Sequence, residues 1–315
     1  MKKIVYVVSA ISAALFNTAA KADVSVSGSA TAAYVDAGGN TIGLTAGGVS
    51  FALSTTTDAG VSISASAAIG RDKDSTAAAN SVSTAVTALT FGFASGSITV
   101  GDDIGVADGA GKVGELATWS DTNLRAITYE TGLQDDEGSG ISASTSIGDM
   151  SLGLQYVWDG AGGGNIDGGT TTSQGASLSM PVGAATLTLA TASDDVSGTN
   201  QTETAGALSM PVAGGTVAVG ITSVGGDTAS KKGEAYSAKY STTMGGVSVA
   251  IGYTGHDAGT ASAGGKAQRT DLVLSTSLGG GASLWAEYSS VSGTIAADSA
   301  STSNGVIAVG TAVAF

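Results

Sequence analysis

Residues 89–157 read LTFGFASGSITVGDDIGVADGAGKVGELATWSDTNLRAITYETGLQDDEGSGISASTSIGDMSLGLQYV. At both ends of this stretch apolar and polar residues alternate around short turns, which predicts β-hairpins at 89–100 and 141–157. Residues 102–140, between the hairpins, are the longest segment after residue 23 without clean alternation. This insert carries a dense set of carboxylates: Asp102, Asp103, Asp108, Glu115, Asp121, Glu130, Asp135, Asp136 and Glu137.

The first 22 residues have the three-part pattern of a secretory signal peptide. Lys2 and Lys3 form a basic start, residues 4–15 are apolar, and Ala20-Lys21-Ala22 supplies a cleavage site with small residues at both ends. An uncleaved membrane anchor is the alternative, but the apolar run is shorter than the roughly 17 residues that an anchor needs. We therefore expect residues 1–22 to be cleaved and residues 23–315 to form the folded domain.

The remaining sequence is too apolar for a soluble secreted protein, yet it offers no helix that could cross a membrane. Only 12% of the residues are charged and the mean hydropathy is positive. No window after residue 22 contains 18 uninterrupted apolar residues, the minimum for a membrane-spanning helix. A closed β-barrel is the other structure that pairs every backbone polar group inside a bilayer. The composition therefore predicts an all-β protein, a transmembrane antiparallel β-barrel.

The charge and the cysteine content of the chain restrict the partners that it can bind and the chemistry that it can perform. Without Lys2, Lys3 and Lys21 the chain has nine basic against 26 acidic residues, a net charge of −17. This balance argues against nucleic acid and is compatible with attracting cations. The absence of cysteine excludes disulfides, thiol chemistry and Cys-based metal sites. The single histidine, His256, cannot form a metal cluster alone, and we expect it in a solvated loop.

Alternation of period two continues along the chain and predicts about 16 strands. Tight turns, such as 94–96 and 244–246, alternate with longer connections, such as 71–80 and 159–169. Outer-membrane barrels have this asymmetry, with short turns on the periplasmic side and longer loops outside. An even number of strands also returns the C-terminus to the side on which residue 23 begins.

One further segment, RAITYET at 125–131, also has strand alternation. Including it would make the number of strands odd, which a barrel with both termini on one side does not allow. Parity therefore assigns residues 141–147 to the barrel and places 125–131 within the insert.

The two prolines of the chain occur in near-copies of one sequence. Pro181 lies in LSMPVG and Pro211 in LSMPVA, with a spacing of 30 residues. Because proline is excluded from strand interiors, we expect both prolines to mark turns between strands of opposite direction. The spacing equals that of one double hairpin and is not sustained elsewhere, which favours repetition within a barrel over a solenoid.

Alternation also assigns residues to the two faces of a strand. Arg269, Asp271 and Ser275 share a face that we expect to line the lumen. The residues expected to meet lipid in the last strands are Leu272, Leu274, Thr276, Leu278, Ile307, Val309, Thr311, Val313 and Phe315. A secreted β-sandwich would bury this apolar face in a core, but only 5% of the residues are aromatic, and Ala, Gly, Ser and Thr fill most other positions.

Several stretches, taken together in their order and spacing, match a known family. They are DVSVSGSA at 23–30, TTDAGV at 56–61, FGFASGSITVGD at 91–102, LGGGAS at 278–283 and the terminal Phe315. The chain resembles the Gram-negative general porins, most closely the small porins of α-proteobacteria, over essentially all of residues 23–315. The resemblance implies a homotrimer of 16-stranded barrels in the outer membrane. It also implies that Phe315 is the signal read by the barrel-assembly machinery.

The resemblance further implies that the third loop, residues 102–140, folds into the lumen as a constriction. Barrels of this strand number leave an aqueous channel, through which ions and small hydrophilic solutes would diffuse passively. Carboxylates at a constriction attract cations, so we expect mild cation selectivity. The acidic candidates on the loop are Asp102, Asp103, Asp108, Glu115 and Asp121. The basic candidates on the facing wall are Arg71, Arg125, Lys239 and Arg269.

The sequence departs from the family pattern in its aromatic and basic residues. With only nine basic residues, the transverse field across the constriction is expected to be weaker than in the family. Aromatic residues for the two lipid-interface girdles are also few. Those that could serve are Tyr34, Tyr156, Trp158, Tyr236, Tyr240, Tyr253, Trp285 and Tyr288.

Other functions fit less of the sequence. A surface adhesin or S-layer-like structural protein is the alternative that the acidic, Ala/Gly/Ser/Thr-rich composition allows. An enzyme is not expected, because no Ser-His-Asp set exists away from His256 and the Gly-rich runs lie in turns rather than before a helix. Asp135-Asp136-Glu137 is dense in oxygen ligands for Ca²⁺, but it lacks the spacing of a calcium loop. We therefore expect an acidic turn there, with no metal and no cofactor.

Overall fold

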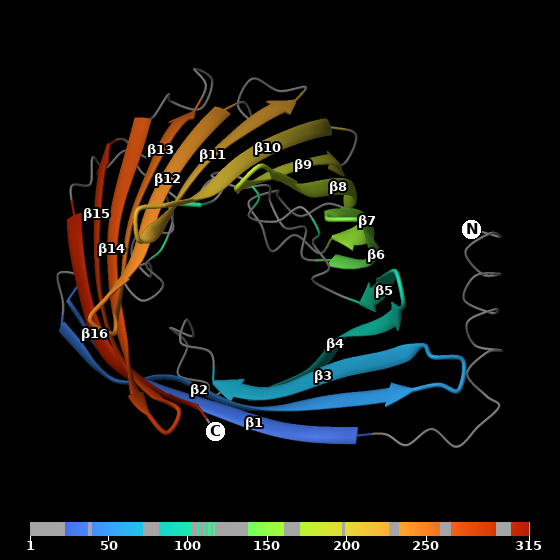
Figure 1. The fold of residues 1–315 in the computed structure, drawn as a ribbon, viewed down its shortest axis with the longest axis horizontal. Helices are drawn as coiled ribbons and strands as arrows, with labels where there is room; N and C mark the ends of the chain where they lie inside the picture. Colours follow the sequence, from blue (N-terminus) through green and yellow to red (C-terminus); the bar gives the residue numbers. More distant parts are fainter. Residues whose placement is uncertain are drawn as a thin grey trace.

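The strands close into a single antiparallel barrel. The structure, a computed structural model, describes residues 23–36, 40–71, 82–101, 106, 110, 113–114, 116, 138–160, 171–196, 199–226, 233–258, 266–293 and 304–314. In this part of the chain, 16 strands each pair with their neighbours in sequence, and β1 pairs with β16 to close the ring (Figure 1). The expected all-β barrel with about 16 strands is confirmed. Within the described residues we find no helix of the length and apolarity needed to cross a membrane.

All strands except β5 have ten or more residues, enough to cross the apolar band of about 25 Å when tilted. The strands are β1 (Asp23–Asp36), β2 (Asn40–Thr56), β3 (Ser62–Arg71), β4 (Val82–Phe93), β5 (Gly96–Gly101), β6 (Gly138–Ile147), β7 (Met150–Gly160), β8 (Thr171–Val182), β9 (Ala185–Val196), β10 (Thr199–Val212), β11 (Gly215–Gly226), β12 (Gly233–Met244), β13 (Val247–Ala258), β14 (Lys266–Gly279), β15 (Ala282–Gly293) and β16 (Asn304–Ala314). Residues 1–22 lie outside the described residues, so the signal peptide stays a prediction.

One end of the barrel, which we call the turn end, has only short connections. The other, the loop end, has the longer connections, together with short ones between β1 and β2 and between β9 and β10. The connection from β8 to β9 has two residues, and Gly183 there has φ +64°. This left-handed conformation is unfavourable for a residue with a Cβ, so glycine is required. The expected alternation of short and long connections is present except at the connections from β1 to β2 and from β9 to β10. Residues 141–147 belong to β6, as parity predicted, and 125–131 lie outside the described residues.

The two prolines lie at strand ends and not in the turns, which corrects the expectation from sequence. Pro181 and Pro211 are the penultimate residues of β8 and β10, and each pairs with the next strand across the turn. The pairing of β8 with β7 has already ended at Ser179, and that of β10 with β9 at Ser209. Each proline therefore has a strand neighbour on one side only, a position that tolerates a residue without an N–H group.

Solvent exposure alternates along the strands and separates a polar inner face from an apolar outer face. On β14, Arg269 and Asp271 are 2% and 0% exposed on the inner face, whereas Leu278 is 61% exposed on the outer face. On β16, Ile307 is exposed and Ala308 is buried. The face assignments for these two strands are confirmed. Phe315 lies outside the described residues.

Trp285 lies on the inner face of β15, so its expected place at the lipid boundary is wrong. It shares this face with Glu287 and packs against Ala33 and Ala308 of the neighbouring strands. Gly310 pairs with Trp285, and a Cβ at Gly310 would collide with the indole ring. Small residues on β1 and β16 thus make room for an inward-facing indole. Aromatic residues exposed on the outer face toward the loop end are Tyr156, Trp158, Tyr236 and Tyr288.

The four methionines after Met1 share one zone of the outer face, beside the tight turns. Met150 is the first residue of β7 and Met244 the last residue of β12. Met180 and Met210 lie two residues before the ends of β8 and β10. Thioether side chains therefore gather at the turn end of the outer face.

Candidate functional site

The insert leaves the barrel wall below its loop-end rim because β5 is short. Gly101, the last residue of β5, pairs with Ala88 on one side and Gly140 on the other. Strand β4 begins at Val82, so the wall extends beyond Gly101 toward the loop end. The chain that follows Gly101 therefore starts within the height of the barrel.

The described residues of the insert lie against the inner face, on successive strands. The backbone N–H of Val106 donates a hydrogen bond to the Gln155 side-chain oxygen on β7. Ala110 packs against a cluster of small residues on β9 and β10, formed by Ala190, Ala192 and Ala205. The short coloured pieces of the insert are visible inside the ring of strands in Figure 1. The path thus begins along the wall from β7 to β10.

Farther along the insert, Gly114 makes the closest approach to the wall. The N–H of Val113 donates to Ser237 Oγ on β12 at 3.2 Å. A Cβ at Gly114 would collide with the carbonyl oxygen of Tyr253, and a Cβ at Gly252 would collide with the carbonyl oxygen of Gly114. Glycine is therefore required on both sides of this contact, which brings the insert onto the backbone of β13.

A buried carboxylate on β14 binds the next residue of the insert. Asp271 Oδ2 accepts a hydrogen bond from the N–H of Leu116 at 2.9 Å. Arg269 Nε lies 2.9 Å from both carboxylate oxygens, and the Ser289 hydroxyl donates to Oδ1 at 2.6 Å. Asp271 thus links β14, β15 and the insert. From Val106 to Leu116 the described residues contact the inner wall from β7 to β14.

The structure describes only some of the site residues expected from sequence. Lys239 lies half-buried on the inner face of β12, together with Ser237. Arg269 also lies on the inner face, where the carboxylate of Asp271 pairs its charge. Arg71 is the last residue of β3, and its side chain is outside the description. The candidates that lie outside the described residues are Asp102, Asp103, Asp108, Glu115, Asp121 and Arg125.

Three buried acidic residues of the inner face, Asp271, Glu203 and Glu287, were not among the acidic site residues expected from sequence. Asp271 was expected on the lumen side, but its bond to the insert was not predicted. Glu203 and Glu287 are buried on the inner faces of β10 and β15. In the sequence, such a residue can be recognised because it is charged and because, in a strand of alternating polarity, it shares its face with small residues.

Calcium binding at Asp135-Asp136-Glu137 stays untested, because these residues are outside the described part of the chain. Among the residues that the structure describes, no group of three or more His, Asp or Glu side chains is placed to hold a metal ion.

A closed barrel with an apolar outer face and a polar inner face defines a transmembrane β-barrel of the channel class. A model of the Gram-negative porin family matches residues 8–299. The chain therefore belongs to the Gram-negative porins, a family of non-enzymatic channels of the outer membrane. A search of curated proteins finds no match.

Solved porin structures share this fold at low sequence identity. OmpF of Salmonella typhi, in complex with daunomycin, has a TM-score of 0.72 and 13% identity, covering 93% of this chain and 97% of that chain. An anion-selective porin from Comamonas acidovorans has a TM-score of 0.68 and 18% identity, covering 94% and 100%. OmpT of Vibrio cholerae, in a trimer form, has a TM-score of 0.65 and 11% identity, covering 93% and 99%. At these identities the similarity shows the fold alone.

Proposed function

We propose that this porin forms a water-filled channel through which ions and small hydrophilic solutes diffuse passively. The contact of the insert with the inner wall carries the proposal. Hydrogen bonds to Gln155, Ser237 and Asp271 hold parts of the insert against strands β7 to β14. A segment held against the inner wall narrows the passage. The family and the closed barrel favour this channel over the adhesin or S-layer-like protein that the composition also allows.

We further propose that the whole insert, residues 102–140, forms the constriction and makes the channel mildly cation-selective. In the sequence, Asp102 and Asp103 follow Gly101, the last residue of β5, and Glu115 comes between Gly114 and Leu116, which both contact the wall. Carboxylates at a narrow passage raise the local cation concentration and oppose anions. The surplus of acidic over basic residues in the chain supports this direction.

The reversal potential across a planar bilayer, measured under a KCl gradient, tests the cation selectivity. The wild-type protein should give a cation-selective potential, and the variant Asp102→Asn/Asp103→Asn/Asp108→Asn should move it toward zero. A control variant, Asp58→Asn/Asp149→Asn, removes exposed carboxylates at the turn end and should leave the potential near the wild-type value. An unchanged reversal potential in the insert variant would show that these three residues do not lie in the pore. A wild-type protein that does not conduct would contradict the channel itself.

A homotrimer is the assembly that we propose for this chain. OmpT of Vibrio cholerae, which shares the fold, is described in a trimer form. The native mass of the detergent-purified protein tests the proposal, and a monomer mass at all concentrations would contradict it. Phe315, which follows β16, remains our proposed signal for the barrel-assembly machinery, and its removal should lower the amount of protein in the outer membrane.

A further inference from the structure

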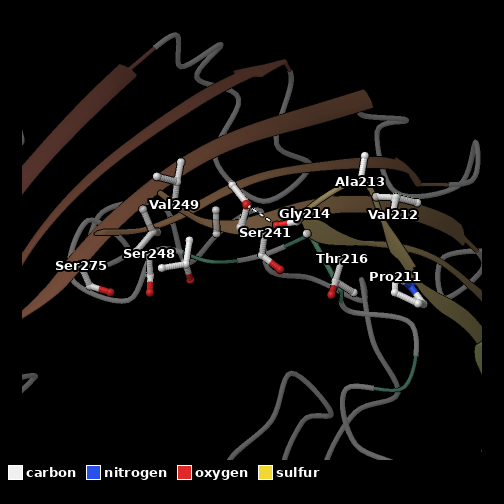
Figure 2. A pocket seen from close by; sticks show the side chains of 14 residues that line it. Pro211, Val212, Ala213, Gly214, Thr216, Ser241, Ser248, Val249 and Ser275 are labelled. Atoms are coloured by element: carbon white, nitrogen blue, oxygen red, sulfur yellow. Dashed lines mark hydrogen bonds between the residues drawn. The ribbon is translucent and has the colours of Figure 1, made fainter. Parts of the chain in front are cut away.

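The inner wall on the turn side of the insert contains two hollows. The larger, of about 850 Å³, lies on β10 to β14 (Figure 2). The smaller, of about 530 Å³, lies between β6 to β10 and the insert residues Val106, Ala110 and Val113. Among the residues that the structure describes, none that lines either hollow is charged. The charged inner-face residues Lys239, Asp271 and Glu203 lie nearer the loop end.

The polar lining of the larger hollow consists mainly of hydroxyl groups on the inner face. Figure 2 shows Thr216 and Ser248 on one side of the sheet, with Val249 and Ala213 on the other. Val273, Ala250 and Pro211 supply apolar surface between the hydroxyls. The inner-face hydroxyl residues are Thr216, Ser241, Thr243, Ser248 and Ser275.

The hydroxyl groups that line the larger hollow differ in their hydrogen bonds from two threonines of the outer face. On the outer face, Thr242 donates to the carbonyl oxygen of Gly214 at 2.6 Å, and Thr311 to that of Ser283 at 2.9 Å. Lipid offers no partner, so these two hydroxyls bond within the protein. By contrast, the described structure gives no protein partner to the hydroxyls of Thr216, Ser241, Ser248 and Ser275. These inner-face hydroxyls are therefore available to molecules in the lumen.

The chemistry of this lining favours one class of solute. A hydroxyl group both donates and accepts, so it matches the hydroxyls of a sugar in either direction. An ion receives no opposite charge from this wall to replace the water that it loses. The apolar patches between the hydroxyls suit the C–H faces of a sugar ring. We propose that the 850 Å³ hollow is a weak binding site for neutral polyhydroxylated solutes such as short oligosaccharides. The proposal rests on the channel function proposed above.

Single-channel recording in a planar bilayer with maltohexaose tests this site. We expect the sugar to interrupt the ion current, and hexagalacturonate, a charged chain of the same length, to interrupt it less. The variant Ser241→Ala/Ser248→Ala/Ser275→Ala keeps the size of the side chains and removes three hydroxyls. Because a solvent-exposed hydrogen bond contributes little, the sugar residence time should fall about three- to tenfold.

The control variant, Ser290→Ala/Ser292→Ala, removes hydroxyls from the outer face of β15 and should leave the residence time unchanged. Equal residence times in the wild type and in the inner-face variant would overturn the site, as would a wild-type current that maltohexaose does not interrupt. Both of these outcomes leave the ion conductance intact. A wild-type protein without ion conductance would instead overturn the channel function on which the site depends.

Discussion

Asp271 shows how one buried side chain can join the insert to the wall. Its carboxylate accepts hydrogen bonds from Arg269, Ser289 and the backbone of Leu116, and it is 0% exposed. A buried charge is tolerated only where it is paired and its remaining lone pairs are satisfied. The ion pair with Asp271 also stabilises the charge of Arg269, because the Arg269 side chain is buried too. The pair therefore serves the stability of the barrel and the position of the insert together.

Replacing Asp271 by Asn should remove the buried negative charge that lies 2.9 Å from Arg269 Nε. We expect the free energy of unfolding to fall by about 3–5 kcal/mol, measured by urea titration of the protein folded in lipid vesicles. The double variant Arg269→Met/Asp271→Asn should recover part of the loss, because it also removes the buried positive charge of Arg269. Asp149→Asn, at an exposed turn, is the matched control and should change little. A double variant less stable than the single one would contradict this account of the pair.

At the scale of strands, period-two alternation was enough to predict both the barrel and its faces. The inward Asp271 and Ala308 and the outward Leu278 and Ile307 follow directly from phase along β14 and β16. Parity correctly chose residues 141–147 for β6, because a closed barrel with adjacent ends needs an even count. These features depend on local pattern and on closure, and both can be read from one chain.

Contacts between distant segments could not be predicted in this way. Trp285 was assigned to lipid because aromatic residues usually gather there, but its phase on β15 is inward and Gly310 leaves space for its ring. The bond from Leu116 to Asp271 joins residues 155 positions apart in the chain. No periodicity connects them, so the insert could be predicted as an irregular segment but its path along the wall could not.

For the whole molecule, the outer face should behave as a band whose sensitivity to charge depends on depth. Ile251 lies mid-strand on the outer face of β13, and Met244 lies at the turn end of β12. Ile251→Arg should lower the free energy of unfolding by about 2–4 kcal/mol, because the charge enters the bilayer midplane, whereas Met244→Arg should lower it by only about 0–1 kcal/mol. Urea titration in lipid vesicles measures both. Equal losses at the two positions would contradict the placement of the membrane.

The overall fold does not determine which ions the channel prefers. The porin from Comamonas acidovorans has this fold and is anion-selective, while the present chain carries a net charge of −14. Similar barrels thus differ in the side chains that they present to the lumen. The ion selectivity of this chain therefore needs its own measurement.

The methionines beside the tight turns give the molecule a ready set of spectroscopic reporters. Apart from Met1, all of them lie on the outer face at the turn end: Met150, Met180, Met210 and Met244. Isotope labelling of their methyl groups would yield a small number of NMR signals, all from one boundary between protein and bilayer. Paramagnetic lipids should broaden these signals, whereas a paramagnetic agent confined to the lumen should not. The natural methionines can thus report how deeply the barrel sits in the bilayer, and no cysteine has to be introduced for labelling.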